Sequence, residues 1–452
     1  MQQGRRALLG LALLGGVSRV MSAHAMPQSG GALSALRDPD HGRLDAELAA
    51  IFSDPACQLA SMSVIAVRHG KPVYQRQLGH RVIDGDASQP VTARTMFRIA
   101  SISKFMTTLG LMRLVEEGRV TLDADVSTWL GFSLRNPHFP DQPITLRHLL
   151  THNASLRDDA GYAWPADRAL KDILVPGAPH YGDGKMWSPR APAGAYFTYC
   201  NLNWAVIGTL MERVTGERFD RLMKRLLLDP LGLRGGYNPS EMGAEDVANI
   251  ATLYRKRTTD TEVWDPNGPW IAQVDDFGKK APAPPPGIGN YAVGTNATPF
   301  SPTGGLRISA AGLSTVMLML MNRGRHEGRQ FLKPETVLSM LTRQWTFDGR
   351  GENGDSNRNL FYAWGLGNQH YTDQPLTGHQ VVEGGGFSGI GHFGYAYGLR
   401  SAFVMDPASG NGMIMLVGGS STEPELQPGR YSSMPRMQER ILTALYRHAI
   451  AA

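Results

Sequence analysis

Apolar positions alternate or run continuously near both ends of the chain, and they follow helical spacing between those ends. Near the amino terminus, apolar runs at 62–67 and 72–78 flank the turn-forming residues His69-Gly70-Lys71, which predicts two strands joined by a tight turn. Towards the carboxyl terminus, four further runs predict strands at 361–365, 392–396, 399–405 and 412–417. Apolar spacing predicts helices at 44–52, 101–117, 309–322, 334–342 and 434–448.

This order of elements predicts an α+β fold. One antiparallel sheet would be built from N- and C-terminal strands and flanked by helices, with an all-helical insertion over about 121–233. From about 235 to 301 the pattern dissolves into glycine, proline and polar residues, including APAPPPG at 281–287. That segment is predicted to be a long loop, and whether it is a lid or a surface excursion stays open.

Residues 1–25 have the pattern of a secretory signal peptide. Arg5 and Arg6 precede an apolar run at 7–17 that is too short to span a membrane, and Ala23-His24-Ala25 is a typical cleavage site. The alternative is a retained N-terminal anchor. We therefore predict a periplasmic or secreted protein whose remaining residues, 26–452, form one domain without a stable membrane span.

Composition and charge agree with an exported hydrolase. The chain has 452 residues, of which 42% are hydrophobic and 19% charged, enough for a large core. Removing residues 1–25 takes away three arginines and no acidic residue, which leaves a nearly neutral chain. Nucleic acid is therefore not an expected partner. Of the two cysteines, Cys57 and Cys200, we expect burial as small apolar residues rather than a disulfide, although export would permit one.

The candidate nucleophile lies at the start of the helix predicted at 101–117. Ser101-Ile102-Ser103-Lys104 is an S-x-x-K sequence, and on a helix this spacing places the hydroxyl and the amine on one face. A lysine kept neutral by burial can take the proton of a serine and so activate it. The alternative is that Ser101 only caps the helix and that Lys104 is a solvated charge.

Two further motifs support the catalytic interpretation. Tyr199-Cys200-Asn201 offers a phenol that can relay a proton and a carboxamide that can bind a substrate amide. His392-Phe393-Gly394, followed by Tyr395, enters a predicted strand, where glycine lets a substrate approach the backbone.

These motifs occur within six ordered segments, from about residue 62 to the carboxyl terminus, that resemble the serine β-lactamase and penicillin-binding-protein superfamily. The resemblance is greatest to its class C β-lactamase, D,D-peptidase, D-aminopeptidase and esterase branch. The segments are FRIASISK, ITLRHLLTH, PAGAYFTYCNLNWAVIG, PTGGLRISAAGLSTVMLMLMNRG, WGLG and GHFGYAYG. The resemblance implies a β-lactamase/transpeptidase-like fold and a small-molecule or peptide substrate.

The resemblance also implies a role for each motif residue. Ser101 would be the acyl-accepting nucleophile, Lys104 and Tyr199 would share the acid and base work, and Asn201 would contact the substrate. The backbone N–H groups of Ser101 and of Tyr395, which follows Gly394, would form the oxyanion hole. We expect the site at a seam, with Ser101 on the helical side and His392 on the edge strand of the sheet.

Two departures from the family pattern bear on the substrate. His392 stands where β-lactamases usually carry lysine, and histidine is only partly charged near neutral pH, whereas β-lactam carboxylate recognition favours a permanent cation. The family's usual H-x-S-G-L is here His152-Asn153-Ala154-Ser155-Leu156, which we interpret as structural and away from the nucleophile. We therefore predict hydrolysis of an ester or a D-amino-acid amide or peptide. The alternatives are a β-lactamase and a non-catalytic penicillin-binding-like protein.

Other patterns in the sequence carry less weight. The H-x-G matches at 180–182 and 326–328 lie in predicted loops, and the G-x-G-x-x-G match at 384–389 opens no helix. No G-x-S-x-G, H-E-x-x-H, paired C-x-x-C or P-loop occurs, so we expect neither a cofactor nor a metal. Trp364, Tyr395 and Tyr397 could line the pocket, although aromatic residues on strands more often pack. The sequence leaves the oligomeric state open.

Overall fold

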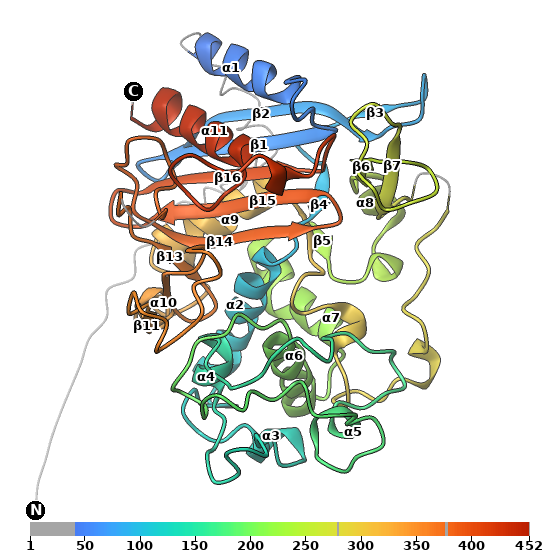
Figure 1. Ribbon diagram of the computed structural model, residues 1–452, viewed down its shortest axis with the longest axis vertical. Coiled ribbons are helices and arrows are strands. Elements are labelled where there is room, and N and C mark those ends of the chain that lie inside the picture. The colour runs from blue at the N-terminus through green and yellow to red at the C-terminus, as the bar shows by residue number, and fades with distance from the viewer. Residues whose placement is uncertain (1–40, 278–279, 376–377, 452) are drawn as a thin grey trace, which may run out of the picture. The chain divides into compact units, whose positions relative to one another are not determined.

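Strands from opposite ends of the chain pair in one antiparallel sheet (Figure 1). The computed structural model describes residues 41–277, 280–375 and 378–451. Its nine-stranded sheet has the order β11-β12-β13-β14-β15-β16-β1-β2-β3. The strands of the two ends meet where β1 (Ser61–Arg68) pairs with β16 (Asn411–Val417), with Met62 opposite Val417. On one side of this pair lies β2 (Lys71–Val82), and on the other lies β15 (Leu399–Asp406). The predicted α+β fold is confirmed.

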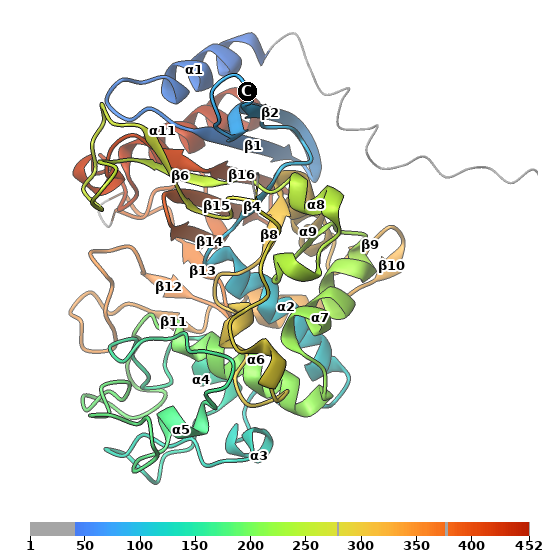
Figure 2. The same cartoon turned by 90° about the vertical axis from the view of Figure 1, so that its right-hand side faces the viewer.

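Helices cover both faces of the sheet, which explains why β1 is buried along nearly its whole length. On one face lie α1 (Gly42–Phe52), α11 (Arg436–Leu445) and the π-helical turn η8 (Tyr446–Ile450), which pack against one another (Figures 1 and 2). On the other, α9 (Ala310–Met321) contacts β1 and β16. Each face therefore has its own apolar core.

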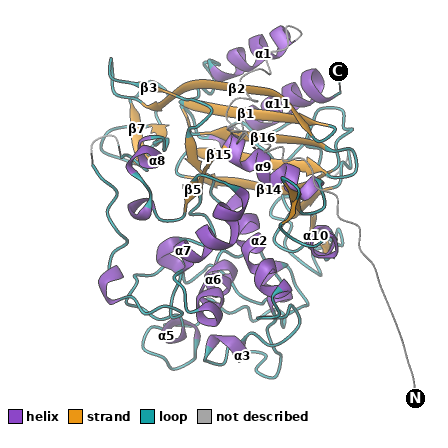
Figure 3. Cartoon of the chain, turned by 180° about the vertical axis from the view of Figure 1, so that it is seen from behind, coloured by secondary structure: helices purple, strands orange, loops and turns teal. Residues whose placement is uncertain are grey.

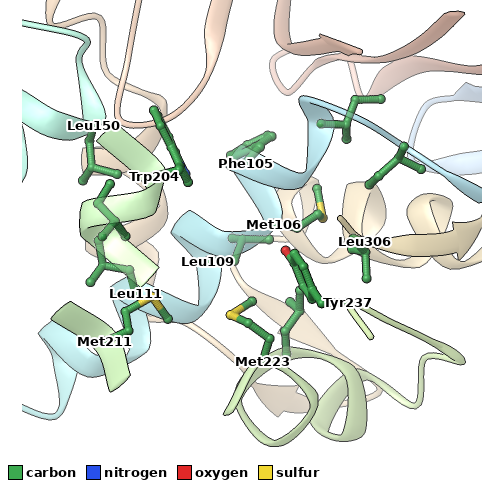
Figure 4. Close-up of a cluster of buried hydrophobic side chains, with 14 of the residues drawn as sticks. Phe105, Met106, Leu109, Leu111, Leu150, Trp204, Met211, Met223, Tyr237 and Leu306 are labelled. Atoms are coloured by element: carbon green, nitrogen blue, oxygen red, sulfur yellow. The ribbon is translucent and has the colours of Figure 1, made fainter. Parts of the chain in front are cut away.

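The helical part of the chain is built around two long helices, α2 (Ile102–Glu116) and α6 (Leu202–Thr215) (Figure 3). The α2 helix contacts β14 and β15 as well as α6, and most of its residues are buried, so it connects the sheet to the helical part. Figure 4 shows Phe105, Leu109 and Trp204 within the apolar cluster around these helices. Shorter helices complete this part: α3 (Ser127–Leu130), α4 (Leu146–Leu150), α5 (Lys171–Leu174), α7 (Phe219–Met223) and the π-helical turn η2 (Lys224–Leu228).

The segment at 235–301 differs from the predicted long loop. It contains α8 (Ala244–Ala248) and a hairpin of β6 (Leu253–Lys256) and β7 (Trp270–Val274). A third strand, β17 (Gly419–Ser420), pairs with β6 in parallel. The hairpin escaped prediction because every residue of β7 is only partly buried, so its sequence lacks the alternation that marks a strand with one buried face.

The strand that carries the third motif, β14 (Gly389–Ala396), is not the edge strand that we predicted. Three short strands lie beyond it: β13 (Gln369–Tyr371), β12 (Ala363–Trp364) and β11 (Trp345–Thr346). The pairing of β13 with β14 nevertheless ends at Gly391, so residues 392–396 pair with β15 only. The other strands and α-helix of the described residues are β3 (Gln89–Pro90), β4 (Met96–Arg98), β5 (Gly235–Gly236), β8 (Arg307–Ser309), β9 (Arg325–His326), β10 (Arg329–Gln330) and α10 (Pro334–Leu341).

Two predictions concern export. The predicted signal peptide at 1–25 lies outside the described residues. Within the described ranges, the structure contains no helix with the length and apolar character needed to cross a membrane.

The two cysteines, Cys57 and Cys200, are buried and do not form a disulfide with each other. Each lies within a different apolar cluster.

Candidate active site

The candidate nucleophile precedes the first turn of α2. The backbone at Ala100 is left-handed, with φ of 46°, and Ser101 follows it at the N-cap position. The Ser101 side chain makes no capping hydrogen bond. Instead, Lys104 Nζ donates to Ser101 Oγ over 3.0 Å. The structure therefore places the hydroxyl against the amine, as the S-x-x-K spacing predicts, and gives Ser101 no capping role.

Lys104 is fully buried, and burial is the largest influence on its charge. Desolvation lowers the pKa of Lys104 to about 7, and the carboxylate of Asp158 opposes this shift only in part. A substantial fraction of the amine is therefore neutral at physiological pH. Such an amine can accept the proton of Ser101.

Tyr199 is the second side chain next to the nucleophile. Its phenol shares a hydrogen bond with Ser101, and Lys104 Nζ lies 5.0 Å from the centre of its ring. Burial raises the pKa of Tyr199 well above its usual value, so the phenol keeps its proton at physiological pH. In this arrangement Lys104 is the better base, and Tyr199 is suited to donate or relay a proton.

Asn201 positions the amine. Its Oδ1 accepts hydrogen bonds from Lys104 Nζ at 2.7 Å and from Thr303 Oγ1 at 2.9 Å. The Thr303 carbonyl is a third acceptor for Lys104, at 3.2 Å. Because Oδ1 is occupied in this way, the predicted contact of Asn201 with substrate would have to use its remaining amide hydrogen.

Asp158 holds the second motif in place, and sequence reasoning missed it. Its carboxylate accepts from Asn201 N at 2.9 Å, from Asn201 Nδ2 at 2.8 Å and from Leu202 N at 3.0 Å, at the start of α6. The Cys200 thiol donates to the same carboxylate at 3.3 Å. The sequence contains one indication of this role: Asp158 is an acidic residue two positions after Leu156, the last residue of the His152 segment. Thr303 lies in the PTGG segment and could have been singled out there.

His152 is closer to the site than we predicted. Its ring lies 4.5 Å from the ring of Tyr199, and its Nδ1 accepts from the backbone N–H of Cys200 at 3.0 Å. Burial lowers the pKa of His152 well below its usual value, so the ring is neutral. His152, at the H-x-S-G-L position, therefore packs against Tyr199. Both belong to an aromatic cluster that also contains Phe197, Trp204, Trp364 and Phe361. Trp364 is fully buried in that cluster, where it packs rather than lines an open pocket.

His392 faces the same aromatic cluster. Its ring lies 5.4 Å from that of Trp364 and 6.2 Å from that of Tyr199, and the residue is 2% exposed. Burial and the nearby Lys104 lower the pKa of His392 to about 3. His392 is therefore neutral across the physiological pH range, whereas the sequence predicted that it would be partly charged.

Gly394 lets β14 approach the nucleophile. A Cβ atom at this position would lie 2.3 Å from the Ile99 carbonyl oxygen and 3.2 Å from the backbone nitrogen of Ser101. No side chain fits in that space, so glycine is required for the two backbones to meet. This proximity is what the predicted oxyanion hole of Ser101 and Tyr395 needs.

Only the backbone of Tyr395 is directed towards the site. Because side chains alternate along a strand, His392 and Gly394 share the face of β14 that meets α2, and Tyr395 lies on the opposite face. There its ring lies against the Arg400 guanidinium at 3.7 Å. The suggestion that the Tyr395 side chain lines the pocket was therefore wrong. Within the described ranges, no group of three or more histidine, cysteine or acidic side chains is arranged to hold a metal ion.

Comparison with known proteins identifies a matching family and several individual relatives. The sequence matches the β-lactamase family over residues 43–432. It is 30% identical over 207 residues to esterase EstB of Burkholderia gladioli, covering 43% of this chain and 52% of that protein. It is 26% identical over 302 residues to a putative D-alanyl-D-alanine carboxypeptidase of Escherichia coli, covering 62% of this chain and 64% of that protein. The chain spans about half the length of the curated esterase it matches, and less of several others.

Solved structures share the fold at lower identity. A class C β-lactamase superposes with a TM-score of 0.60 at 16% identity, over 91% of this chain and 96% of the other. The hydrolase EstCE1, described as having promiscuous acyltransferase activity, superposes with a TM-score of 0.56 at 19% identity, over 90% and 99%. These structures show the shared fold, and the family match over most of its length shows that the chain belongs to the β-lactamase and penicillin-binding-protein superfamily of serine hydrolases.

Proposed function

We propose that this protein hydrolyses an ester, or an amide such as a D-amino-acid peptide, through an acyl-enzyme on Ser101. The observation that carries the proposal is the 3.0 Å hydrogen bond from Lys104 Nζ to Ser101 Oγ, with the amine buried. Burying an amine costs stability. Here the buried amine is directed at a hydroxyl next to a phenol, where it can act as a base.

In the proposed reaction, Ser101 Oγ attacks the scissile carbonyl carbon as its proton passes to the neutral Lys104 amine. The oxygen of the tetrahedral species takes the negative charge, which the N–H groups of Ser101 and Tyr395 stabilise. Collapse of this species breaks the bond to the leaving group, which takes a proton from Lys104 directly or through the Tyr199 phenol. Water then attacks the acyl-enzyme in the same way, gives one proton to the same machinery, and releases the acid and Ser101.

The chemistry of the third motif supports an ester or amide over a β-lactam. A β-lactam presents a carboxylate beside its scissile bond, and a neutral His392 offers that carboxylate no charge. Relatives of this chain include esterase EstB and lovastatin esterase, and the neutral site is compatible with the esters that these names describe. A putative D-alanyl-D-alanine carboxypeptidase is also a relative. Its peptide substrate ends in a carboxylate next to the scissile bond, so the neutral His392 favours an ester or an amide without that carboxylate. β-Lactamase activity is the second candidate, supported by the match to that family.

We further propose that the protein acts outside the cytoplasm, in the periplasm or the medium. The support is the sequence of residues 1–25, with two arginines, an apolar stretch and an A-x-A site. Export would place the enzyme where cell-wall peptides and external esters are present.

The test is to trap the acyl group. The protein and its Ser101→Ala variant are incubated with a p-nitrophenyl ester, a D-alanyl-D-alanine peptide and a fluorescent penicillin, and turnover and intact mass are followed. We expect turnover of an ester or peptide that falls by about a thousandfold or more in Ser101→Ala, and a mass adduct that disappears with it. Activity retained in Ser101→Ala would disprove the mechanism. Peptide binding without any adduct or turnover would favour the non-catalytic alternative.

A further inference from the structure

The charged groups identified around the nucleophile are already paired within the protein. The amine of Lys104 has three acceptors, in Ser101, Asn201 and Thr303. The Asp158 carboxylate receives the donors at the start of α6. Apart from their roles in the reaction, the Lys104 amine and the Asp158 carboxylate therefore have little capacity left to bind a charged substrate.

A second ionic cluster lies on the strands next to the nucleophile. Asp275 is buried at the end of β7, where it accepts from Arg307 at 2.6 and 3.1 Å and from Arg98 Nε at 3.4 Å. Two cations thus share one anion. Arg98, three residues before Ser101, has the more exposed side chain of the two, at 15%. Its guanidinium is therefore a cation close to the nucleophile in the sequence that could attract an anionic substrate.

The ring of Tyr397 covers that cation. Tyr397 lies in the turn between β14 and β15, three residues after Gly394, and the Arg98 guanidinium is 5.7 Å from its ring centre. The turn holds Tyr397 in the left-handed conformation, with φ of 55°, an uncommon state for a tyrosine. The side chain is nevertheless 48% exposed, so it presents an aromatic surface to solvent above Arg98.

Tyr162 lies on the helical side of the same region. It follows Asp158 by four residues, beyond the left-handed Gly161, and its side chain is 42% exposed. The Asp158 carboxylate accepts from Asn201 Nδ2, and Asn201 in turn accepts from Lys104, so this loop lies next to the second motif. Burial, and then Tyr397 and Asp158, raise the pKa of Tyr162, in agreement with that position. The acidic and basic neighbours on its loop, Asp159 and Arg157, pair with each other at 2.7 Å.

We propose that Tyr162 and Tyr397 form an aromatic mouth to the active site that selects an uncharged, aromatic or apolar substrate group, with Tyr397 shielding Arg98 from anionic substrates. The selectivity rests on the proposed esterase function and names its substrate class. A neutral aromatic group can stack on two half-exposed rings. A carboxylate in the same place would lose water and find the Arg98 guanidinium paired with Asp275 and covered by a ring.

A matched pair of esters tests this inference on the full-length protein. Phenyl acetate and 4-carboxyphenyl acetate differ by one carboxylate on the leaving group. On the acyl side, p-nitrophenyl valerate and mono-p-nitrophenyl glutarate likewise differ by a methyl group in place of a carboxylate. Each kcat/KM is divided by the rate of hydroxide hydrolysis, to remove intrinsic reactivity. We expect the neutral ester to be preferred by about tenfold or more in at least one pair.

Variants then separate shielding from simple packing. Tyr397→Asn removes the ring but tolerates the left-handed turn, so it should uncover Arg98 and raise kcat/KM for the anionic ester of that pair. Adding Arg98→Gln should abolish this gain. The control is Tyr181→Asn, which makes the same change in a loop beside α5 and should leave the ratio unchanged.

The outcomes distinguish this inference from the proposed function. Ester turnover with no preference, or with a preference for the anionic ester, would overturn the aromatic mouth and leave the esterase intact. A neutral preference that Tyr397→Asn does not reduce would also overturn it, because the shield would then lie elsewhere. Absence of both turnover and Ser101 adduct with all four esters would reject the esterase and the mouth together.

Discussion

The Asn201 carboxamide oxygen lies 2.7 Å from Lys104 Nζ, closer than the Ser101 hydroxyl, which lies at 3.0 Å. Asn201 is itself held through its nitrogen atoms by Asp158. The second motif therefore sets the position of the amine that the first motif needs as a base. Its asparagine is neutral, which keeps the amine free of a directly bonded anion and lets burial lower its pKa.

The first prediction concerns the pH dependence of the reaction. Because the pKa of Lys104 is about 7 and the base is the neutral amine, kcat/KM should rise with pH and level off above a midpoint near 7. Asn201→Asp would place an anion against the amine, favour the ammonium form and move this midpoint to higher pH. Asn201→Ala is the control, since it removes the contact without adding charge. A midpoint that stays the same in Asn201→Asp would contradict the assignment of this limb to Lys104.

The second prediction concerns the stability cost of burying Lys104. Its pKa falls from 10.5 in the unfolded chain to about 7 in the folded protein, so between these values the unfolded state holds the extra proton. The free energy of unfolding should therefore increase as pH rises from about 7 towards 10. Lys104→Met should raise the Tm at pH 6, and this advantage should shrink by pH 9. Thermal unfolding at several pH values measures both effects, and a Met variant less stable at every pH would refute the argument.

Much of the fold follows from local patterns, because β1, β15 and β16 are continuous apolar runs and α2 and α6 are long apolar helices. The hairpin of β6 and β7 was missed because the residues of β7 are half-buried, and its partner β17 is remote in sequence. Strand order is likewise a tertiary property: β11 and β12 have two residues each, too few to carry a pattern that would have placed them beyond β14.

For the site, the motifs predicted which residues meet but not how they are oriented. Ser101, Lys104, Tyr199 and Asn201 converge as expected. The supporting residues Asp158 and Thr303 act through hydrogen bonds across long sequence separations, which no local spacing reveals. The pKa of His392 depends on burial, which is set by the packing of the whole site.

The third prediction concerns the ionic cluster of Asp275. Asp275→Asn would leave Arg98 and Arg307 without their anion, and breaking a buried ion pair costs about 3 to 5 kcal/mol of unfolding free energy. Asp123→Asn is the matched control, because the pair of Asp123 and Arg147 is largely exposed, so its loss should cost about 1 kcal/mol or less. Urea unfolding of both variants measures the difference. Equal losses would show that the Asp275 cluster does not stabilise the strands beside Ser101.

The last prediction concerns the contact between β14 and the nucleophile. In Gly394→Ala, the new Cβ would overlap the Ile99 carbonyl oxygen, at 2.3 Å, and Ser401 Oγ, at 2.4 Å, so β14 must move away from Ser101 N. An oxyanion hole that uses the N–H groups on both sides of this contact would widen, and loss of one such donor costs about a hundredfold or more in kcat.

The matched control for this variant is Gly243→Ala, where nothing lies within 4 Å of the new Cβ. Its kcat should be unchanged. Because the hole acts on the transition state, Gly394→Ala should lower kcat with little change in the binding of a substrate analogue. Stopped-flow acylation and thermal unfolding of both variants test this. A fall in Tm with kcat unchanged would show that Gly394 serves packing alone and that the oxyanion is stabilised by other donors.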